Sequence, residues 1–341
     1  MKVYAGMDPR LGPAGAVAHA KRVEALGYDG LHVAETIHDS LALALLVAEH
    51  TKRITIRTAV TLAFPRSPTL TAYAAWDLAR FSGGRFQLGL GTQIRQNIEE
   101  RYGMPWGEPV ERLRDYLGAL GALYRAFTTG GPVSHHGPYY RVTRLQPYFN
   151  PGPDPKTTPP STYLGGVNAG VCQLAGELAD GFVTHPTNSN PRYLRSICLP
   201  NLAIGAQRAG RDLSDLELVV GTQVITGPDD ATLSAERDRQ RRLFAFLYST
   251  PAYRRTLELY GWEEMAPRLA DMVRDDDWSD LASVVTDQVL DTLVPTGRFE
   301  EVPEILLDRF APLGQGILLG APADDSHDTA FARVVAELRA A

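Results

Sequence analysis

The sequence of 341 residues has few cysteines, no long apolar run and no excess of basic residues. Its two cysteines, Cys172 and Cys198, are separated by 25 residues (173–197), a spacing typical of neither a metal site nor a redox pair. We therefore expect two reduced, half-buried thiols in a cytoplasmic protein. No stretch approaches about 18 uninterrupted apolar residues, and no apolar core follows Lys2. Neither a membrane span nor a signal peptide is expected.

The sequence also lacks the signatures of several functional classes. The formal net charge of −6 argues against a partner that is nucleic acid or an anionic membrane, because such proteins show basic clusters. No HExxH, paired CxxC or clustered-carboxylate motif is present, and the adjacent His135 and His136 would point to opposite faces of a strand. We expect no metal site. A nucleophile elbow, a phosphate-binding Walker loop and a dinucleotide fingerprint are absent as well.

What is present is an alternation of short apolar runs with amphipathic stretches. This alternation is typical of right-handed βαβ units and a parallel sheet. Eight such runs favour a (β/α)8 TIM barrel over an open doubly wound sheet. The predicted strands cover residues 3–6, 31–34, 54–60, 86–90, 162–165, 181–184, 216–226 and 317–319. The predicted helices cover residues 14–26, 41–50, 70–81, 110–124, 170–178, 193–209, a stretch from 229 onward, and 330–340.

Two segments do not fit the barrel alternation. Residues from about 130 to 160 are rich in turn residues, aromatics and proline, which indicates a functional flap or an inserted hairpin. Residues from about 251 to 291 indicate a helical insertion before the last unit. No low-complexity linker divides the chain, so we expect residues 1–341 to form one barrel domain with these two insertions.

In such barrels the catalytic groups lie in the loops that follow the strands. This rule selects a short set of candidates: Asp8, Glu35, Thr36, His38, Asp39, residues 61–67, residues 91–97, Gly165, Gly166, Asn168 and His185. Residues 35–39 have the highest density of acid and base side chains. Histidine exchanges protons near neutral pH, and a neighbouring carboxylate can orient it. In the alternative interpretation, Asp39 only caps the next helix and His38 is an ordinary loop residue.

The glycine-rich turn after the fifth strand is a candidate phosphate site. Gly165 and Gly166 permit close backbone approach, and the following helix begins with unpaired N–H groups near Val167 and Asn168. Glycine turns are common in barrels, so the same residues are also compatible with a tight turn that binds nothing. Gly89 and Gly91 have the same two interpretations.

Together these residues form a pattern that resembles the bacterial luciferase-like superfamily, and within it the oxidoreductases that use the deazaflavin coenzyme F420. The similarity extends in colinear order over nearly the whole chain. Its most specific parts are Ser-Gly-Gly-Arg-Phe with Gly-Leu-Gly, and Ala-Asp-Gly. The matching segments are residues 25–30, 33–36, 64–68, 78–86, 88–92, 165–167 and 175–182.

The resemblance implies a pocket at the strand C-termini in which the cofactor ring stacks over strands two to four. It also implies a non-proline cis peptide between residues 59 and 62, and a cofactor phosphate at residues 165–168 supported by the region of Asp180. The implied cofactor-binding residues are Thr36, Ala59, Val60, Thr61, Gly91, Thr92, Asn97, Gly165, Gly166, Val167, Asn168 and His185.

The sequence departs from the family pattern at two positions. Better-known F420 enzymes have a catalytic histidine where this chain has Thr36, and an acidic proton donor where we align Ile94. His38 and Asp39 are therefore our substitutes for a proton relay, with His38 moving the proton and Asp39 orienting it. Glu35 or Thr36 would position the ring.

These features predict an F420-dependent enzyme that transfers a hydride to or from a small, largely apolar organic substrate. The alternatives are a monooxygenase that uses reduced FMN and O2, and a non-catalytic flavin-binding barrel. Arg66, Arg95 and Arg101 would form a basic groove for the oligoglutamate tail of F420, which FMN lacks. Tyr139, Tyr140, Tyr148 and Phe149 of the flap would cover the substrate. The resemblance further implies a homodimer formed through helices of the first barrel units, and a flavin or F420 reductase is a further expected partner.

Overall fold

The computed structural model describes all 341 residues, and its central element is a closed barrel of eight parallel strand positions. Strand β3 pairs with β2 on one side and with β5 on the other, which closes the sheet. The predicted (β/α)8 barrel is thus confirmed. The strands are β1 (Lys2–Gly6), β2 (Gly30–Val33), β3 (Thr55–Thr58) with its extension β4 (Thr61–Leu62), β5 (Phe86–Gly91), β8 (Thr162–Gly166), β9 (Gly181–Thr184), β10 (Glu217–Val220) and β13 (Gly316–Leu318).

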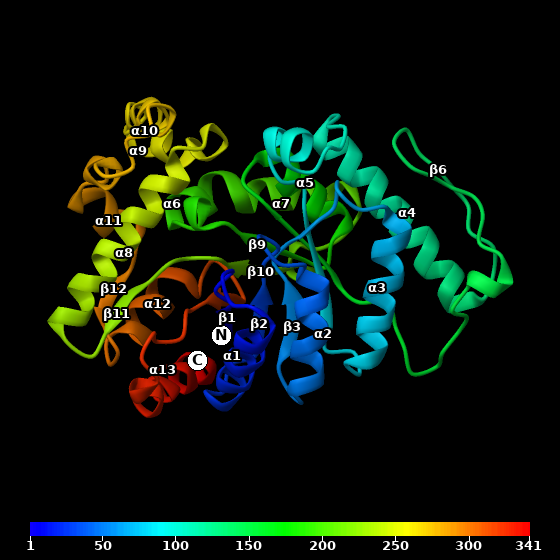
Figure 1. Ribbon diagram of the computed structural model, residues 1–341, viewed down its shortest axis with the longest axis horizontal. Helices are drawn as coiled ribbons and strands as arrows, with labels where there is room; N and C mark the ends of the chain where they lie inside the picture. Colours follow the sequence, from blue (N-terminus) through cyan, green and yellow to red (C-terminus); the bar gives the residue numbers. More distant parts are fainter.

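Helices surround the barrel, as Figure 1 shows. Many of them begin at a proline, which has no N–H to leave unpaired, or at a side chain that accepts an N–H of the first turn. The third helix has both, since it begins at Pro68 and Ser67 accepts the N–H of Leu70. The ring consists of α1 (Pro13–Ala25), α2 (Ser40–His50), α3 (Pro68–Phe81), α4 (Pro109–Thr129), α5 (Ala169–Leu178), α6 (Pro191–Tyr193) continuing through a π-helical turn (Leu194–Cys198) into α7 (Leu199–Arg208), α12 (Val302–Phe310) and α13 (Asp328–Ala340). No helix is both long enough and apolar enough to cross a bilayer.

The main differences from the sequence prediction are a strand that is divided in two, a longer helix and one additional helix. The predicted strand 216–226 is two strands, because Gly221 donates its N–H to the Thr184 hydroxyl and the chain then leaves the barrel. The second strand, β11 (Ile225–Gly227), pairs with β12 (Thr296–Arg298) outside the barrel. Helix α4 continues to Thr129 instead of ending at Tyr124, and α12 was not predicted at all.

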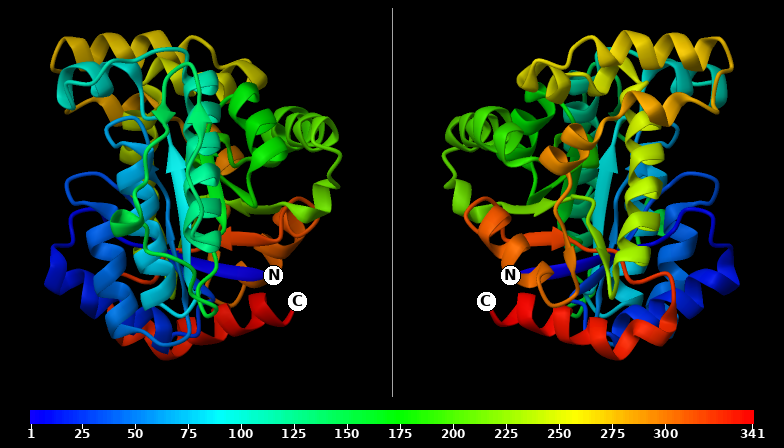
Figure 2. Two further views of the ribbon diagram at one scale, coloured as in Figure 1. Left: turned by 90° about the vertical axis from the view of Figure 1, so that its right-hand side faces the viewer. Right: turned by 90° about the vertical axis from the view of Figure 1, so that its left-hand side faces the viewer.

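The segment 251–291 builds three helices with α8 (Asp230–Tyr248) beside them: α9 (Arg255–Tyr260), α10 (Met265–Arg274) and α11 (Asp287–Leu293). Fourteen buried residues of this region form a hydrophobic cluster separate from the 62-residue main core. The insertion therefore packs around an apolar centre of its own. In Figure 2 its gold helices lie at the end of the molecule to which the cyan strand β5 points, opposite the red helix α13.

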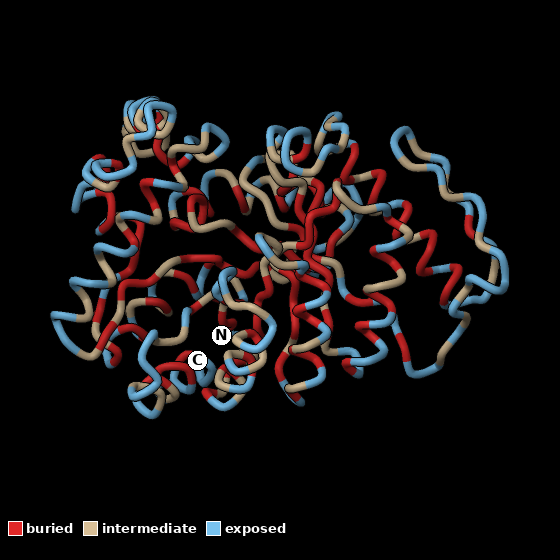
Figure 3. The backbone as a smooth tube through the Cα atoms, in the orientation of Figure 1, coloured by how far each residue is buried: buried red, intermediate tan, exposed pale blue.

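The segment 130–160 contains an antiparallel hairpin of β6 (His135–His136) and β7 (Arg141–Val142). The hairpin lies on the outer side of α4, at the right of Figure 1, and Figure 3 shows it as largely exposed. His135 and the backbone N–H groups of Tyr139 and Tyr140 bind Asp115 of α4 at distances of 2.6–2.7 Å. The segment does not cover the strand C-termini, so the predicted role of its aromatic residues over the substrate is wrong.

The barrel interior contains a buried polar layer that the sequence analysis did not predict. Arg57 of β3 is fully buried, and its guanidinium lies between the rings of Tyr4 and Tyr163 at 4.5 and 3.7 Å from their centroids. Both tyrosine hydroxyls donate to Glu217, which also pairs with Lys2 at 2.9 Å. This layer crosses the barrel on the side of the strand N-termini, away from the loops that follow the strands.

Candidate active site

Glu35 connects the loop after β2 to the loop after β3. Its side chain is only 8% exposed and pairs with Arg66 at 2.7 Å. One carboxylate oxygen also accepts hydrogen bonds from the Ser40 hydroxyl at 3.0 Å and from the backbone N–H of Leu62 at 3.2 Å. All of these partners belong to the chain itself, so Glu35 is suited to hold the two loops in place and not to exchange a proton.

The peptide bond between Ala59 and Val60 is cis, within the range implied by the family resemblance. The side chain of Val60 lies between two glycines of neighbouring strands. A Cβ atom on Gly91 would lie 2.5 Å from one methyl group of Val60, and a Cβ on Gly165 would lie 2.7 Å from the other. Glycine at both positions therefore lets Val60 pack against β5 and β8, and half-buried Val60 fills the space beside both glycines to form an apolar seat at the barrel mouth. Thr61, also predicted to bind the cofactor, is fully buried and bonds the Ser40 hydroxyl at 2.8 Å.

Thr36 and His38 are the two residues of the loop after β2 whose side chains have no partner in the chain. The Thr36 hydroxyl oxygen is buried and makes no hydrogen bond. A buried hydroxyl without a partner is unfavourable, so a ligand atom at this position would stabilise it. The His38 ring is half-buried, and neither of its nitrogens is hydrogen-bonded within the chain. Both groups are available to a bound molecule.

Asp39 does not orient His38. Its carboxylate caps helix α2 by accepting the N–H groups of Leu41 and Ala42 at 2.9 and 3.0 Å, and it pairs with Arg66 at 2.9 Å. Partial burial alone would raise the pKa of Asp39, but the Ala42 N–H and the Arg66 guanidinium lower it below its usual value. The capping interpretation of this residue is therefore the one that the structure supports.

The glycine turn after β8 leads directly into α5. Asn168 caps the helix by accepting the Val171 N–H at 3.0 Å. The N–H groups of Ala169 and Gly170, in the first turn, have no acceptor in the chain and are suited to an anion. Two residues of the loop after β9 support this turn from behind, because Asn188 donates to the Gly166 carbonyl and Tyr193 to the Val167 carbonyl.

His185 follows β9 and stacks on Tyr253 of the insertion, with 4.6 Å between ring centroids. Its Nδ1 lies 2.9 Å from the Thr187 hydroxyl and 3.4 Å from the Thr187 N–H, which leaves Nε2 without a partner in the chain. Burial lowers the pKa of His185 to about 4. The imidazole is therefore a neutral hydrogen-bond donor at physiological pH. Tyr253 of the insertion is therefore an aromatic residue at the barrel mouth. The sequence analysis expected such aromatic residues to come from the 130–160 segment.

The loop after β5 contains the predicted residues Thr92 and Asn97. The Thr92 hydroxyl donates to the Gln93 carbonyl at 3.0 Å, and half-buried Asn97 begins a π-helical turn (Asn97–Arg101). Between them, Gln93 adopts a left-handed backbone with φ of 63°. Such a conformation is uncommon for residues other than glycine and often occurs at functional sites. The sequence analysis included Gln93 only as part of residues 91–97, because no residue pattern indicates this conformation.

The three arginines that were predicted to form a basic groove are engaged in other interactions. Arg66 is paired with Glu35 and Asp39, and Arg95 is paired with Glu99 at 3.0 Å. Arg101 donates to the carbonyl of Thr36, which connects the loops after β5 and β2. Arg66 and Arg95 are therefore neutralised by carboxylates, whereas exposed Arg101 has no acidic partner.

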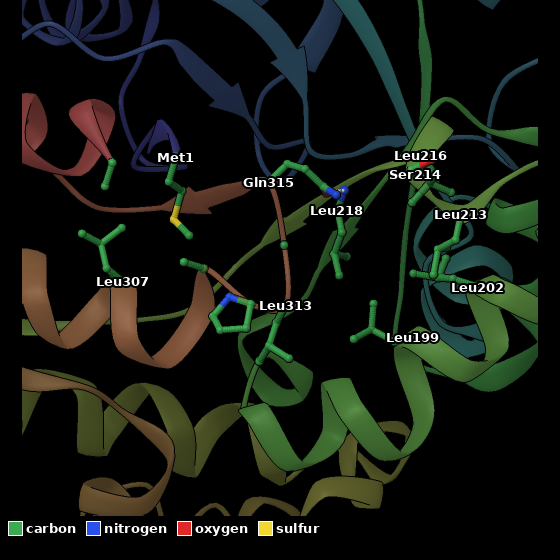
Figure 4. Close-up of a pocket in the computed structure, with 14 residues that line it drawn as sticks. Met1, Leu199, Leu202, Leu213, Ser214, Leu216, Leu218, Leu307, Leu313 and Gln315 are labelled. Carbon is green, nitrogen blue, oxygen red and sulfur yellow. Dashed lines mark hydrogen bonds between the residues drawn. The ribbon is translucent and has the colours of Figure 1, made fainter.

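A separate cavity of about 580 Å3 lies at the opposite end of the barrel, between α7 and α12. Figure 4 shows leucines converging on it, with Gln315 and Ser214 at its edge. Leu216 and Leu218 line it from the start of β10, so it is remote from the loops that follow the strands. Both polar side chains are hydrogen-bonded to the chain, to Leu218 N and Asp212 respectively. None of the side chains that line the cavity is an acid or a base.

Comparison with known proteins agrees with this geometry. Residues 4–315 match the family described as luciferase-like monooxygenase. An uncharacterized protein of Mycobacterium tuberculosis is 38% identical over 290 residues, which cover 85% of each chain. The F420-dependent glucose-6-phosphate dehydrogenase of Beutenbergia cavernae is 29% identical over 247 residues, covering 69% of this chain and 71% of that one. The structure of the coenzyme F420 dependent tetrahydromethanopterin reductase of Methanopyrus kandleri superimposes with a TM-score of 0.81 at 19% identity, covering 99% and 98% of the chains.

Proposed function

Since this chain belongs to the luciferase-like monooxygenase family, we propose that it is an oxidoreductase that binds coenzyme F420 at the C-terminal ends of its barrel strands. In this proposal it catalyses hydride transfer to or from a small, largely apolar organic substrate. The observation that carries the proposal is the seat formed by Val60 between Gly91 and Gly165. A flat ring would stack on Val60, because the glycines on either side of it add no side chain of their own.

The residues around the seat fit such a cofactor. The unpartnered hydroxyl of Thr36 lies in the adjacent loop and can bond a polar atom at the ring edge. The free N–H groups of Ala169 and Gly170 can hold a phosphate, and the dipole of α5 favours the negative charge. His185 offers a neutral donor from the neighbouring strand. When bound, F420 would supply or accept the hydride; the chain supplies position, exclusion of water and proton transfer.

The substrate would lie against an apolar rim on the loops after β2 and β5. Ile37 is 66% exposed although it is apolar, and it directly precedes His38. Ile94 occupies the position where better-known F420 enzymes have an acid. Tyr253 contributes an aromatic ring from the insertion. These side chains favour a substrate with little charge near the reacting carbon.

His38 is our candidate for the proton carrier, because its ring is unpartnered and partly exposed in the loop after β2. We expect His38→Ala to lower turnover by about 100-fold or more while leaving cofactor affinity within about twofold. The measurement is anaerobic oxidation of reduced F420 with a substrate found by screening enones, imines and ketones. His136→Ala is the matched control, since His136 is an exposed histidine of the outer hairpin. Normal turnover of the His38 variant would show that another group moves the proton.

An FMN-dependent monooxygenase, supplied by a partner reductase, is the second candidate. The pairing of Arg66 with Glu35 and Asp39, and of Arg95 with Glu99, favours it relative to the sequence prediction. With Arg66 and Arg95 paired, Arg101 is left as the one unpaired cation of these three for the long anionic tail of F420. A phosphate at the first turn of α5 would serve FMN equally well. The names of the curated relatives favour F420, and direct titration separates the two cofactors.

We also propose a homodimer formed through the outer faces of α2 and α3. Leu45 of α2 and Leu70 and Phe81 of α3 are 47–67% exposed although they are apolar. Exposed apolar side chains that gather on adjacent helices are typical of protein interfaces. We expect a dimer in sedimentation equilibrium, and a shift to monomer for Leu70→Glu. Leu178→Glu, on a different helix, is the control that should remain dimeric. A monomeric wild-type protein would contradict the proposal.

A further inference from the structure

Helices α5 and α7 pack so closely that their backbones are in contact. A Cβ atom on Gly176 of α5 would lie 2.0 Å from the carbonyl oxygen of Leu202 in α7. A Cβ on Gly205 of α7 would lie 1.9 Å from the carbonyl oxygen of Gln173 in α5. Such separations are possible only because both residues are glycine, so this is a helix crossing without intervening side chains.

The two cysteines of the chain face each other one helical turn from this crossing. Cys172 precedes Gly176 by four residues, and Cys198 precedes Leu202 by four, so each lies one turn before its side of the contact. The two thiols are close enough for Cys172 to perturb the pKa of Cys198. Both side chains are completely buried and neither forms a disulfide. The sequence analysis predicted half-buried thiols, and this is wrong because both are fully buried.

The thiol pair lies directly beneath the proposed phosphate site. Cys172 follows Val171, whose methyl group would be 2.7 Å from a Cβ on Gly166. The turn above it, residues 168–170, is exposed or half-exposed. Tyr193, which holds the Val167 carbonyl at 2.7 Å, lies near both cysteines. Any displacement of Cys172 therefore changes the packing of the glycine turn.

We infer that Cys172 and Cys198 are an oxidisable pair that closes to an intramolecular disulfide and thereby weakens anion binding at the first turn of α5. The oxidant is a peroxide, which is small enough to enter a packed interior. One thiol, as thiolate, attacks a peroxide oxygen, and the O–O bond breaks to give a sulfenic acid and water. The second sulfur attacks that sulfenic sulfur, and a second water leaves. Two thiols lose two electrons and two protons, and hydrogen peroxide is reduced to two waters.

Closing the bond brings the two sulfurs to about 2.0 Å, which is closer than two unbonded thiols can approach. In the proposed switch, the contact of the helix backbones at Gly176 and Gly205 stays in place, and the first turn of α5 shifts toward α7. That shift presses Val171 against Gly166 and misaligns the N–H groups of Ala169 and Gly170. By linkage, an anion bound there should in turn slow oxidation of the thiols.

The reaction should be slow because both thiols are buried. The neighbouring Cys172 thiol, followed by burial, raises the pKa of the Cys198 thiol. Little thiolate is therefore present at neutral pH, and thiolate is the reactive form. We expect oxidation over hours at millimolar peroxide.

The test is to incubate the wild-type protein, Cys172→Ala and Cys198→Ala with hydrogen peroxide, and to alkylate remaining thiols in denaturant. In the wild type we expect both thiols to be lost and one disulfide-linked peptide pair to contain Cys172 and Cys198. The affinity for F420 or FMN, whichever the reduced protein binds, should fall at least about fivefold and recover with dithiothreitol. The two alanine variants should keep their affinity after peroxide treatment. An unchanged circular dichroism spectrum excludes unfolding as the cause.

Two results would overturn the inference. If both thiols are still alkylated after peroxide treatment, or if they are oxidised without the linked peptide, the pair does not form a disulfide. If the disulfide forms and affinity changes by less than twofold, the pair does not control the site. The loss of affinity rests on the proposed function, whereas the linked peptide does not. If the reduced protein binds neither cofactor, the proposed function is refuted. The peptide map still shows whether Cys172 and Cys198 form a disulfide.

Discussion

Replacing Arg57 by methionine is expected to lower the free energy of unfolding by about 3–5 kcal/mol. Arg57 is fully buried in β3 and, besides stacking between two tyrosines, donates to the Gln87 side chain at 2.8 Å. A second donor atom lies 3.1 Å from Nε2 of His32, and Glu217 lies 3.5 Å away. Methionine fills much of the volume but leaves these acceptors and one buried carboxylate without their partner. Urea denaturation followed by circular dichroism measures the loss.

The double variant Arg57→Met/Glu217→Gln separates charge from packing. If the loss arises mainly from the uncompensated carboxylate, neutralising Glu217 should recover about 1–2 kcal/mol. Glu217 retains Lys2 and two tyrosine hydroxyls in the single variant, so it is not entirely isolated. A single variant that loses less than about 1 kcal/mol would show that the polar layer contributes little to stability and that its role lies elsewhere.

Replacing Gly205 by alanine is expected to destabilise the protein by about 3 kcal/mol, although alanine is the better helix former. The new Cβ would lie 1.9 Å from the Gln173 carbonyl oxygen, and a backbone atom cannot rotate away as a side chain can. The helices α5 and α7 must therefore separate, which opens the core between them. Thermal and urea unfolding measure the effect.

Gly121→Ala is the matched control for this prediction. Gly121 lies inside α4, and the nearest atom to a Cβ at this position would be the end of the Arg125 side chain, 3.5 Å away. Here alanine should be tolerated and should stabilise the helix by up to about 1 kcal/mol. Opposite signs for the two substitutions would demonstrate that the helix contact, and not helix propensity, requires glycine at 205. Equal effects would contradict the close crossing.

The barrel could be predicted from the sequence because its strands and helices have different hydrophobic periods. The sequence pattern does not show where a strand ends when its end depends on pairing with a distant strand, as in the segment 216–226. Its β-branched residues continue through Gly221, but the strand ends there because the chain pairs next with β12. Arg57 is another example. A charged residue in a short strand suggests an exposed position, and only the aromatic rings of two other strands make its burial possible.

The sequence predicted where the candidate site lies, but it did not predict what several of its residues contact. Glycines 91 and 165 were identified as positions of close approach, but the atom that approaches them, the side chain of Val60, could be found only in the structure. For Asp39 the sequence permitted both a cap and a relay, and hydrogen-bond distances distinguish them. The contact of Cys172 with Cys198 follows from helix packing between residues far apart in sequence, for which no spacing motif exists.

The most direct test of the central claim is equilibrium titration of the purified protein with oxidised F420 and, separately, with FMN, followed by fluorescence and calorimetry. The proposed assignment to F420, which rests on the relatives, predicts F420 binding with a dissociation constant in the micromolar range or below, and FMN binding at least about tenfold weaker, a difference of about 1.4 kcal/mol. The reverse preference would contradict the F420 assignment and move the protein to the oxygen-using branch of the family. Binding of neither cofactor would contradict the claim that the seat at Val60 and the first turn of α5 form a cofactor site.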